Sequence, residues 1–397
     1  MKVTHIITRL VVGGAQENTL ATVRGLRAKP GVEVNLIAGP AIGPEGSLET
    51  EARRIFSDSQ PAAPNYQLQF IPELVRPVHP LKDFIALRKL EKILRAQKPD
   101  LVHTHSGKAG ILGRLAAKRA GVPVIIHHIH GPSFGNFQGA PANFIFTAAE
   151  RHAAKVTDHF IVVAEAMKKN YLAAGIGRPE NYTKVFSGFA LAPFLAAQPD
   201  LALRRQLGFA PEDFVIGQLA RLVPRKGHAD LFTAFKLLLP ACPRARLLLV
   251  GDGHLRADLE VLAKNLGLAE KIVFTGLVPP DAVPRQVSVM DCLAHLSTFP
   301  EGLPRALPQA LAAGKPVVAY DFDSAGEICR EDENGFIIRT GDIQGAAQRL
   351  LQLANDAALR QKFGRAGSDF VRENFSVEKM VDDQYAVYCR LLETRAR

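Results

Sequence analysis

The residues best suited to chemistry in this 397-residue chain lie around Glu301. The apolar residues from Leu303 to Leu311 recur at helical spacing, Pro304 suits a first helical turn, and Gly314 suits the residue after the helix. The N-terminus of such a helix holds an anion well, because its backbone N–H groups are free and its dipole is positive there. A carboxylate just ahead of it suits a ligand with both phosphate and neutral hydroxyl groups, such as a nucleotide-sugar. The alternative is that Glu301 only caps the helix electrostatically.

Two basic residues, Arg221 and Lys226, stand around a turn that follows the apolar run 214–219. Such a pair can neutralise a diphosphate leaving group, on which negative charge grows as its bond breaks. The alternative is that both are ordinary solvated turn residues, which is the role we expect for Arg225.

Histidines gather at the ends of two predicted strands, 101–104 and 123–129. These histidines are His103, His105, His127, His128 and His130. Residues two apart in a strand share a face, so members of each group can act together. They could bind a metal, but no acidic or cysteine partner lies nearby in the sequence, which favours hydrogen-bonding histidines. We therefore expect no metal site and no cofactor.

A glycine pair, Gly13 and Gly14, separates the strand-like run 3–8 from a helical pattern that continues to about Ala28. A strand, a glycine turn and a helix start can cradle a phosphate, because glycine lets the backbone approach an anion closely. The pattern does not match G-x-G-x-x-G, which argues against a dinucleotide-binding domain.

These candidate residues follow predicted strands that alternate with helices, which indicates parallel sheets covered by helices on both faces. Ligands of such sheets bind at the carboxyl ends of the strands, where the candidates lie. Residues 39–80 show weak periodicity and predict loops and a short helix. The predicted strands are 3–8, 32–38, 101–104, 123–129, 160–163, 214–219, 246–250, 272–274, 290–296 and 316–320, and helices are expected over 81–96, 109–120, 134–155, 345–354, 356–374 and 377–392.

Composition sets further bounds. The length suits two domains, and an apolar content of 47% argues against disorder. No apolar run approaches a membrane span and no signal peptide is visible, so we expect a soluble, cytoplasmic protein. The four cysteines form no C-x-x-C pair, which indicates neither a zinc site nor a disulfide framework.

The net charge of +10 arises within residues 1–195. A basic face there could meet an anionic membrane, a phosphorylated substrate or only solvent. Nucleic acid is disfavoured because no stacking aromatics are interleaved with the charges. The helical pattern 81–96 carries the basic residues that we expect at an anionic membrane surface: Lys82, Arg88, Lys89, Lys92 and Arg95.

The stretch from Pro300 to Val318 resembles the E-x7-E segment of the family 4 glycosyltransferases, which are retaining enzymes of the GT-B fold. In that family the first Glu contacts the donor sugar and the second contacts the nucleotide ribose. Here the first is Glu301, whereas the second position holds Gln309, an amide that can still bond a hydroxyl.

Other segments resemble the same family in the same order. They are the G-G-A-Q loop at Gly13, the pair His130-Gly131, the segment Arg221 to Gly227 and the turns after two strands at Gly251 and Leu277. The resemblance implies four catalytic residues: Glu301, His130, Arg221 and Lys226. It implies a donor-binding set of Gly13, Gly14, Gly251, Leu277, Gly302, Leu303, Arg305 and Gln309.

The resemblance implies two Rossmann-like α/β domains facing a central cleft. Residues 1–190 would bind the acceptor, 191–375 would bind the nucleotide-sugar, and the helix 376–397 would cross back to the first domain. The implied reaction transfers a sugar, with retention, from a nucleotide-diphosphate donor to a hydroxyl group during polysaccharide or glycolipid assembly.

A UDP-sugar is the expected donor and a lipid-linked molecule or a glycan the expected acceptor, although the residues themselves specify neither base nor sugar. Two alternatives remain open on the same fold. One is a nucleotide-sugar epimerase, and the other is a non-catalytic nucleotide-sugar-binding subunit, which the Gln309 substitution suggests.

Overall fold

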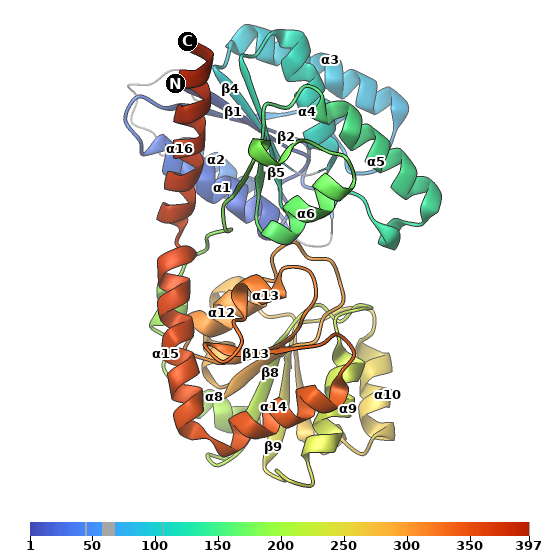
Figure 1. Ribbon diagram of the computed structural model, residues 1–397, viewed down its shortest axis with the longest axis vertical. Coiled ribbons are helices and arrows are strands. Elements are labelled where there is room, and N and C mark those ends of the chain that lie inside the picture. Colours follow the sequence, from blue (N-terminus) through green and yellow to red (C-terminus); the bar gives the residue numbers. More distant parts are fainter. Residues whose placement is uncertain (44–45, 58–67, 106, 397) are drawn as a thin grey trace. The chain divides into compact units, whose positions relative to one another are not determined.

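The computed structural model describes residues 1–43, 46–57, 68–105 and 107–396. They form two compact units (Figure 1). Unit 1 comprises Met1–Phe189 and Val377–Arg397, and unit 2 comprises Ala190–Ser376. Each unit is built on one parallel sheet with helices between successive strands, which is the Rossmann-like arrangement that the alternating pattern predicts.

Unit 1 contains a seven-stranded sheet in the order β3-β2-β1-β4-β5-β6-β7. The strands are β1 Lys2–Ile7, β2 Glu33–Ala38, β3 Leu68–Phe70, β4 Leu101–His105, β5 Val124–Ile129, β6 His159–Val162 and β7 Tyr182–Lys184. Its helices are α1 Gly14–Arg27, α2 Glu49–Ser57, α3 Pro80–Gln97, α4 Gly107–Ala120, α5 Ala140–Ala154, α6 Glu165–Ala173 and α16 Val377–Ala396, with short 3-10 turns at Asn136–Gln138 and Pro179–Asn181.

Two apolar cores cover the two faces of this sheet. Helices α1 and α16 pack together over one face, and α3 and α4 pack together over the other. The close approach of α1 and α16 depends on Gly25, because a Cβ there would lie 2.6 Å from Cγ2 of Val381. The chain thus returns to unit 1 after residue 376, and the last helix completes the core of that unit (Figure 1).

Unit 2 contains a six-stranded sheet in the order β10-β9-β8-β11-β12-β13. The strands are β8 Phe214–Leu219, β9 Ala245–Val250, β10 Ile272–Gly276, β11 Cys292–His295, β12 Val317–Tyr320 and β13 Gly335–Ile338. Its helices are α7 Ala192–Leu195, α8 Leu201–Gln206, α9 His228–Leu238, α10 Arg256–Asn265, α11 Val283–Ser288, α12 Ala306–Ala312, α13 Ala325–Ile328, α14 Ile343–Asn355 and α15 Ala357–Asn374, with 3-10 turns at Ala269–Lys271 and Pro280–Ala282.

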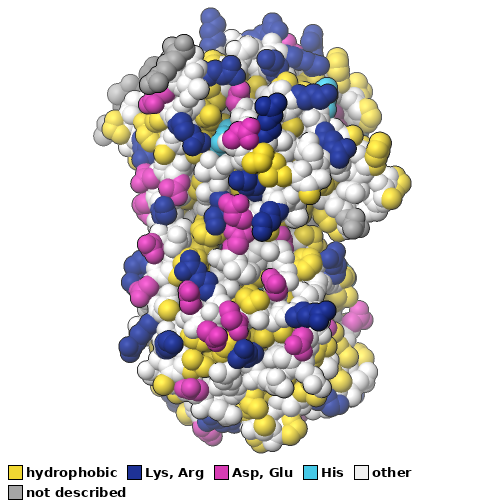
Figure 2. Space-filling view, in the orientation of Figure 1, with side chains coloured by type: hydrophobic (Ala, Val, Ile, Leu, Met, Phe, Trp, Pro, Cys, Tyr) yellow, Lys and Arg dark blue, Asp and Glu magenta, His cyan; other side chains and the backbone are white. Residues whose placement is uncertain are grey.

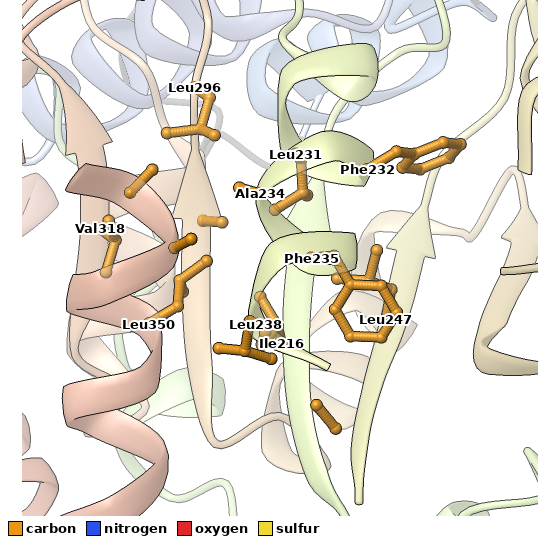
Figure 3. Close-up of a cluster of buried hydrophobic side chains, with 14 of the residues drawn as sticks. Ile216, Leu231, Phe232, Ala234, Phe235, Leu238, Leu247, Leu296, Val318 and Leu350 are labelled. Atoms are coloured by element: carbon orange, nitrogen blue, oxygen red, sulfur yellow. The ribbon is translucent and has the colours of Figure 1, made fainter. Parts of the chain in front are cut away.

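The core of unit 2 lies between its sheet and the helices α9 and α14. Figure 3 shows Leu231, Phe235 and Leu238 of α9 among side chains of the strands, including Ile216 and Leu247. These side chains are almost entirely buried. This packing anchors the start of α9, and therefore the turn that leads into it, against the carboxyl end of β8.

Several short elements differ from the expectations. The strands β3, β7 and β13 were not predicted. β3 and β7 have only three residues each, too few to show alternation, and β13 begins at a glycine, which usually marks a loop. Residues 332–334 form a turn that leads directly into β13 at Gly335. Gly335 is needed there because a Cβ would lie 2.1 Å from the carbonyl oxygen of Val317 on the neighbouring strand.

Two helices begin later than expected. The helix predicted over 134–155 is α5, which starts at Ala140 after glycines with positive φ at 135 and 139. The helix predicted after Glu301 is α12, which spans only Ala306–Ala312. Of the weakly patterned stretch 39–80, residues 44–45 and 58–67 lie outside the described residues, and the rest contains α2 as well as β3.

Candidate functional site

Glu301 of unit 2 lies six residues beyond the end of β11 and is held by three side chains. Its Oε1 atom lies 2.8 Å from Nζ of Lys226 and accepts a hydrogen bond of 3.1 Å from the hydroxyl of Ser297. Nε2 of His295 lies 3.5 Å from the same oxygen. The structure therefore brings together Glu301 and Lys226, two residues that the sequence assigned to different parts of the ligand.

Lys226 is fixed by the turn between β8 and α9. Its carbonyl oxygen accepts a 2.8 Å hydrogen bond from the side chain of Gln218, and the carbonyl of Arg225 accepts one of 2.8 Å from the N–H of Thr298. Gly227 has φ 77°, and a Cβ there would lie 2.0 Å from the carbonyl oxygen of Leu296. Because glycine alone fits this approach, the turn is seated directly on the segment that leads to Glu301.

The electrostatic setting of Lys226 differs from that of an ordinary surface lysine. Its side chain is almost buried, and it lies 4.7 Å from the centre of the Phe299 ring. Burial lowers the pKa of Lys226, against the raising effect of Glu301, and the nearby charge of Arg221 lowers it further. Arg221 is exposed, and among the described residues its side chain has no ion-pair partner, so a ligand can reach it.

The anion site expected directly after Glu301 is not formed as predicted, because α12 starts later in the chain. Residues between Glu301 and Ala306 are not helical, and Gly302 has φ 79°. The N–H of Gly302, expected to face a ligand, instead donates a 2.9 Å hydrogen bond to Oδ2 of Asp323. The hydroxyl of Ser324 also donates to the Gly302 carbonyl. Glu301 therefore does not stand directly before the helix, and this stretch of backbone is braced by the loop after β12.

Asp323 is a residue of this region that the sequence interpretation missed. It has φ 54°, which is uncommon for a residue other than glycine. Burial raises the pKa of its carboxyl, while the hydrogen bonds from the backbone of Gly302 and Glu301 lower it. The available signal was the pair Asp321 and Asp323 immediately after a predicted strand, a place where polar side chains meet ligands or brace loops.

The remaining donor-set residues of this segment lie close to α12. Leu303 is buried, whereas Arg305 is partly exposed and immediately precedes the helix. Gln309 is partly exposed within α12, and its N–H donates to the carbonyl of Arg305. Gln309 is therefore available to a ligand through its amide, as the E-x7-E resemblance requires.

Gly251 and Leu277 belong to a second group of turns at the same end of the sheet. The N–H of Gly251 donates a 3.1 Å hydrogen bond to the carbonyl of Gly276, and a Cβ on Gly251 would lie 2.1 Å from the carbonyl of Ala220. Leu277, next to Gly276, is 84% exposed. An apolar side chain so exposed at a strand end offers a surface for a flat ring, which suits the predicted base-binding role.

In unit 1, the glycine pair lies where the sequence predicts. Gly14 is the first residue of α1, and Gly13 precedes it. Among the residues that the structure describes, no side chain caps this helix start, and the first acidic residue of the helix is Glu17. The leading N–H groups of this 14-residue helix are therefore placed as a phosphate cradle would need them.

His130 follows β5 and is the partly exposed member of a histidine cluster in unit 1. Its Nε2 lies 3.0 Å from Nδ1 of His105, and its ring stacks on His128 with centroids 4.0 Å apart. Burial lowers the pKa of His130 to about 3, so its ring is neutral at physiological pH. His130 can therefore donate or accept a hydrogen bond but cannot supply a positive charge.

The cluster also contains His5, which the sequence interpretation missed. His5 on β1 is paired in register with His103 on β4, so the two rings lie on one face of the sheet. The signal was present in the sequence, because His5 occupies a predicted strand of the same sheet. His127 stands apart from the cluster, with its Nδ1 2.9 Å from the hydroxyl of Thr104.

Comparisons with known proteins agree with this geometry. Residues 13–185 match the model of the family described as Glycosyl transferase 4-like domain, and residues 200–370 match Glycosyl transferases group 1. The chain is 26% identical over 386 residues to the UDP-Gal:alpha-D-GlcNAc-diphosphoundecaprenol alpha-1,3-galactosyltransferase of Escherichia coli, covering 96% of this chain and 95% of that protein.

Two further likenesses come from another relative and a solved structure. The putative glycosyltransferase EpsD of Bacillus subtilis (strain 168) is 29% identical over 316 residues, which cover 77% of this chain and 80% of that protein. The crystal structure of Anabaena Alr3699/HepE in complex with UDP superposes with a TM-score of 0.79 at 22% identity, covering 98% of this chain and 100% of that chain. Together with the two matching domains, these findings show that the chain belongs to the family 4 glycosyltransferases, enzymes of the GT-B fold.

Proposed function

We propose that this glycosyltransferase moves a sugar, with retention of anomeric configuration, from a nucleotide-diphosphate donor to a hydroxyl group of a lipid-linked acceptor. The observation that carries the proposal is the Glu301–Lys226 pair, held beside the exposed Arg221 at the carboxyl end of the unit 2 sheet. A carboxylate and two basic groups so placed fit a ligand with sugar hydroxyls at one end and a diphosphate at the other.

The role proposed for each residue follows from its charge and from the contacts that hold its side chain. The acceptor hydroxyl oxygen forms a bond to the anomeric carbon as the bond between the sugar and the diphosphate breaks. The electron pair of the broken bond goes to the diphosphate oxygen, which takes up the hydroxyl proton, and Arg221 and Lys226 stabilise the charge that develops there. Glu301 accepts hydrogen bonds from sugar hydroxyls. Because its Oε1 is already bound by Lys226 and Ser297, the carboxylate is held in place before the sugar arrives.

Two basic groups also provide the charge compensation that a divalent cation supplies in other transferases. We therefore propose a reaction that needs no metal. Gln309, Leu277 and the turn at Gly251 would bind the nucleoside. The start of α1 at Gly13 and Gly14 would bind a phosphate group of a substrate.

The proposed donor is a UDP-sugar. This is supported by the UDP bound in the Anabaena structure and by the UDP-Gal in the name of the Escherichia coli relative. Thermal unfolding with a panel of UDP-, GDP- and ADP-sugars tests the base, because a ligand that binds only the folded state raises its stability. Stabilisation by a GDP-sugar alone would reject the UDP assignment.

The reaction itself is tested by product analysis. With the stabilising donor and an undecaprenyl diphosphate sugar as acceptor, the expected products are free nucleotide diphosphate and a glycosylated lipid whose new linkage has the anomeric configuration of the donor, as NMR would show. An inverted linkage would reject retention. A new epimer of the donor without a glycosylated product would indicate the epimerase alternative.

A lipid-linked acceptor raises the question of the membrane. None of the described helices has the length and apolar character needed to cross a bilayer. At the start of α3, however, three large apolar side chains are strongly exposed: Val78, Leu81 and Phe84. We propose that this end of α3 binds anionic bilayers reversibly and that unit 1 meets its acceptor there.

The basic residues of α3 should contribute less to membrane binding than their number suggests, because several are already paired with acidic residues. Arg88 and Arg95 both contact Glu91, and Lys89 contacts Glu73. On the face drawn in Figure 2, basic side chains likewise lie among acidic and hydrophobic ones. The apolar residues should therefore carry much of the binding, assisted by the basic residues Lys82 and Lys92.

Flotation with vesicles tests this surface. Binding is expected to vesicles with anionic lipids and to weaken as salt rises. The double change Leu81→Ser/Phe84→Ser should reduce binding more than Arg88→Ala/Arg95→Ala, because the two arginines are already paired. Equal recovery of all variants with neutral and anionic vesicles would reject a membrane role for α3.

A further inference from the structure

Three histidines from neighbouring strands of unit 1 form a hydrogen-bonded row. His5 Nδ1 lies 2.9 Å from Nε2 of His105, and His105 Nδ1 lies 3.0 Å from Nε2 of His130. The ring planes differ by 19° and 22°, and the ring centres are 5.2 and 5.3 Å apart. The rings thus meet edge to edge and nearly in plane, where the donor and acceptor directions of imidazole lie.

A metal site is the competing explanation for this cluster. Two sets of three histidines bring ligand atoms within 4.8 Å of one another: His5, His103 and His105, and His105, His128 and His130. However, the rings of His128 and His130 stack with planes 20° apart, and the rings of His103 and His105 are tilted by 35° with centres 4.3 Å apart. The nitrogen lone pairs of two stacked imidazole rings point in nearly parallel planes, whereas binding of one metal ion by both rings requires the lone pairs to point toward that ion. The geometry favours hydrogen bonding.

The hydrogen bonds of this row have a preferred direction, from His5 as donor toward His130 as acceptor. Burial lowers the pKa of His5 to about 3 and that of His105 well below its ordinary value, so each ring is neutral and carries one N–H. Nε2 of His5 is buried and has no partner among the described residues. A proton on that atom would be a buried donor without an acceptor, whereas a proton on Nδ1 is used in the bond to His105.

This direction propagates along the row. If His5 donates from Nδ1, the Nε2 atom of His105 accepts, and the proton of His105 then lies on Nδ1. That proton is donated to Nε2 of His130, which leaves the proton of His130 on its Nδ1. The partly exposed ring at the end of the row would thus offer an N–H donor.

We propose that His5 and His105 are positioning residues that hold His130 as its Nδ1–H tautomer, so that its partly exposed ring donates a hydrogen bond to a substrate oxygen at the carboxyl end of the unit 1 sheet. The contact with a substrate rests on the proposed function, whereas the tautomer does not. A neutral donor of fixed direction selects an acceptor oxygen without adding a charge near the reacting sugar.

The tautomer is measured directly by nitrogen NMR of histidine-labelled protein without substrate, because protonated and unprotonated ring nitrogens resonate far apart. His130→Gln assigns the signals. At pH 7 the expected result is a protonated Nδ1 and an unprotonated Nε2 on His130. A protonated Nε2 would overturn the proposal. So would signals that shift on addition of zinc and return with chelator, since these would indicate the metal site.

The positioning role is tested by a pair of substitutions. In His105→Asn, the amide can still donate to Nε2 of His130, and both the tautomer and kcat should be largely kept. In His105→Leu, the donor is lost, so the tautomers should mix and kcat should fall by about 10- to 100-fold with a smaller change in KM. His159→Gln is the control, because His159 on β6 contacts Thr183 outside the row. If His105→Leu does not fold, His5→Leu provides the same test, with mixed tautomers expected.

The outcomes separate the two proposals. Equal kcat for His105→Leu, His105→Asn and the unsubstituted protein would show that the row is only structural and would overturn the positioning role. An Nδ1–H tautomer in a protein that transfers no sugar from any donor would reject the proposed function and the substrate contact, while the tautomer assignment would stand.

Discussion

The candidate sites of the two units occupy the same place in their sheets but are built from different kinds of side chain. Each places polar residues at the carboxyl ends of a parallel sheet, but unit 2 uses compensated charges and unit 1 uses neutral rings. In unit 2, Lys226 and Glu301 share an ion pair with Arg221 exposed nearby. In unit 1, His5, His105 and His130 are kept neutral by burial.

The proposed function accounts for this difference. A departing diphosphate gains negative charge, and only a fixed positive charge stabilises it strongly. Ordering a sugar hydroxyl needs direction more than charge, which a neutral imidazole supplies. We therefore expect substitutions in unit 2 to affect the chemical step and acidification to affect unit 1.

The largest effect should come from Lys226. In Lys226→Ala, turnover should fall by on the order of 10²-fold or more, because a preorganised charge at the leaving group is lost. Folding should change little, since Lys226 lies at the site rather than in the apolar core. Single-turnover kinetics of the purified variant, with far-ultraviolet circular dichroism as the folding check, measure both.

Lys236→Ala is a matched control, because Lys236 is exposed on α9 of the same unit. It should keep full activity. Unchanged turnover in a folded Lys226→Ala protein would remove Lys226 from the reaction and leave its ion pair with Glu301 as a purely structural feature.

The second largest effect should be a loss of folding stability at acidic pH, which should be greater in unit 1 than in unit 2. Seven histidines of unit 1 have a pKa lowered chiefly by burial: His5, His103, His105, His127, His128, His130 and His159. Below about pH 6.5 the unfolded chain binds protons that the folded unit does not, so stability present above that pH is lost as the pH falls. Each such histidine can remove up to about 1.4 kcal/mol per pH unit.

Unit 2 should lose less stability. The pKa of His228 is lowered by burial to about 4 and that of His295 is also lowered, but the raised pKa of Asp323 acts in the opposite direction. Hydrogen exchange of peptides from β4 and from β8, compared at pH 7.5 and 5, measures each unit in the same sample. Equal loss of protection in both units would contradict the assignment of acid sensitivity to unit 1.

The sequence predicted those parts of both units whose patterns extend over several residues. Strands of five or six buried residues, such as β8 and β9, were identified, and the turn from Arg221 to Gly227 was recognised. The same is true of the histidine pairs, because residues two apart in a strand share a face whatever the tertiary structure.

The missed features depend on contacts between segments far apart in the chain. No local pattern shows that Asp323 takes the N–H of Gly302, which shifts the start of α12 away from Glu301. Likewise, His5 becomes part of the row only because β1 and β4 are neighbours in the sheet. Register and loop bracing are tertiary properties that periodicity does not contain.

A smaller effect is expected at Gln309. Gln309→Glu should be tolerated and should tighten nucleotide binding by a few-fold, because a carboxylate accepts hydrogen bonds from both ribose hydroxyls whereas an amide has one acceptor oxygen. Gln309 is partly exposed on α12, so the added charge is not buried. Calorimetric titration with the nucleotide diphosphate measures the change. Complete loss of binding by the folded variant would mean that this position serves another role.

The smallest effect should come from removing metal ions. Activity should persist in excess chelator, because under the proposed function Arg221 and Lys226 supply the positive charge at the diphosphate, and the stacked rings of His128 and His130 suit a shared ion poorly. The measurement is the initial rate before and after dialysis against chelator, with added Mg²⁺, Mn²⁺ and Zn²⁺ in parallel. Restoration by Mg²⁺ or Mn²⁺ would place a cation at the diphosphate and reduce the role of the basic pair. Restoration by Zn²⁺ alone would instead direct attention to His105, His128 and His130, where imidazole nitrogens are the ligands that zinc prefers.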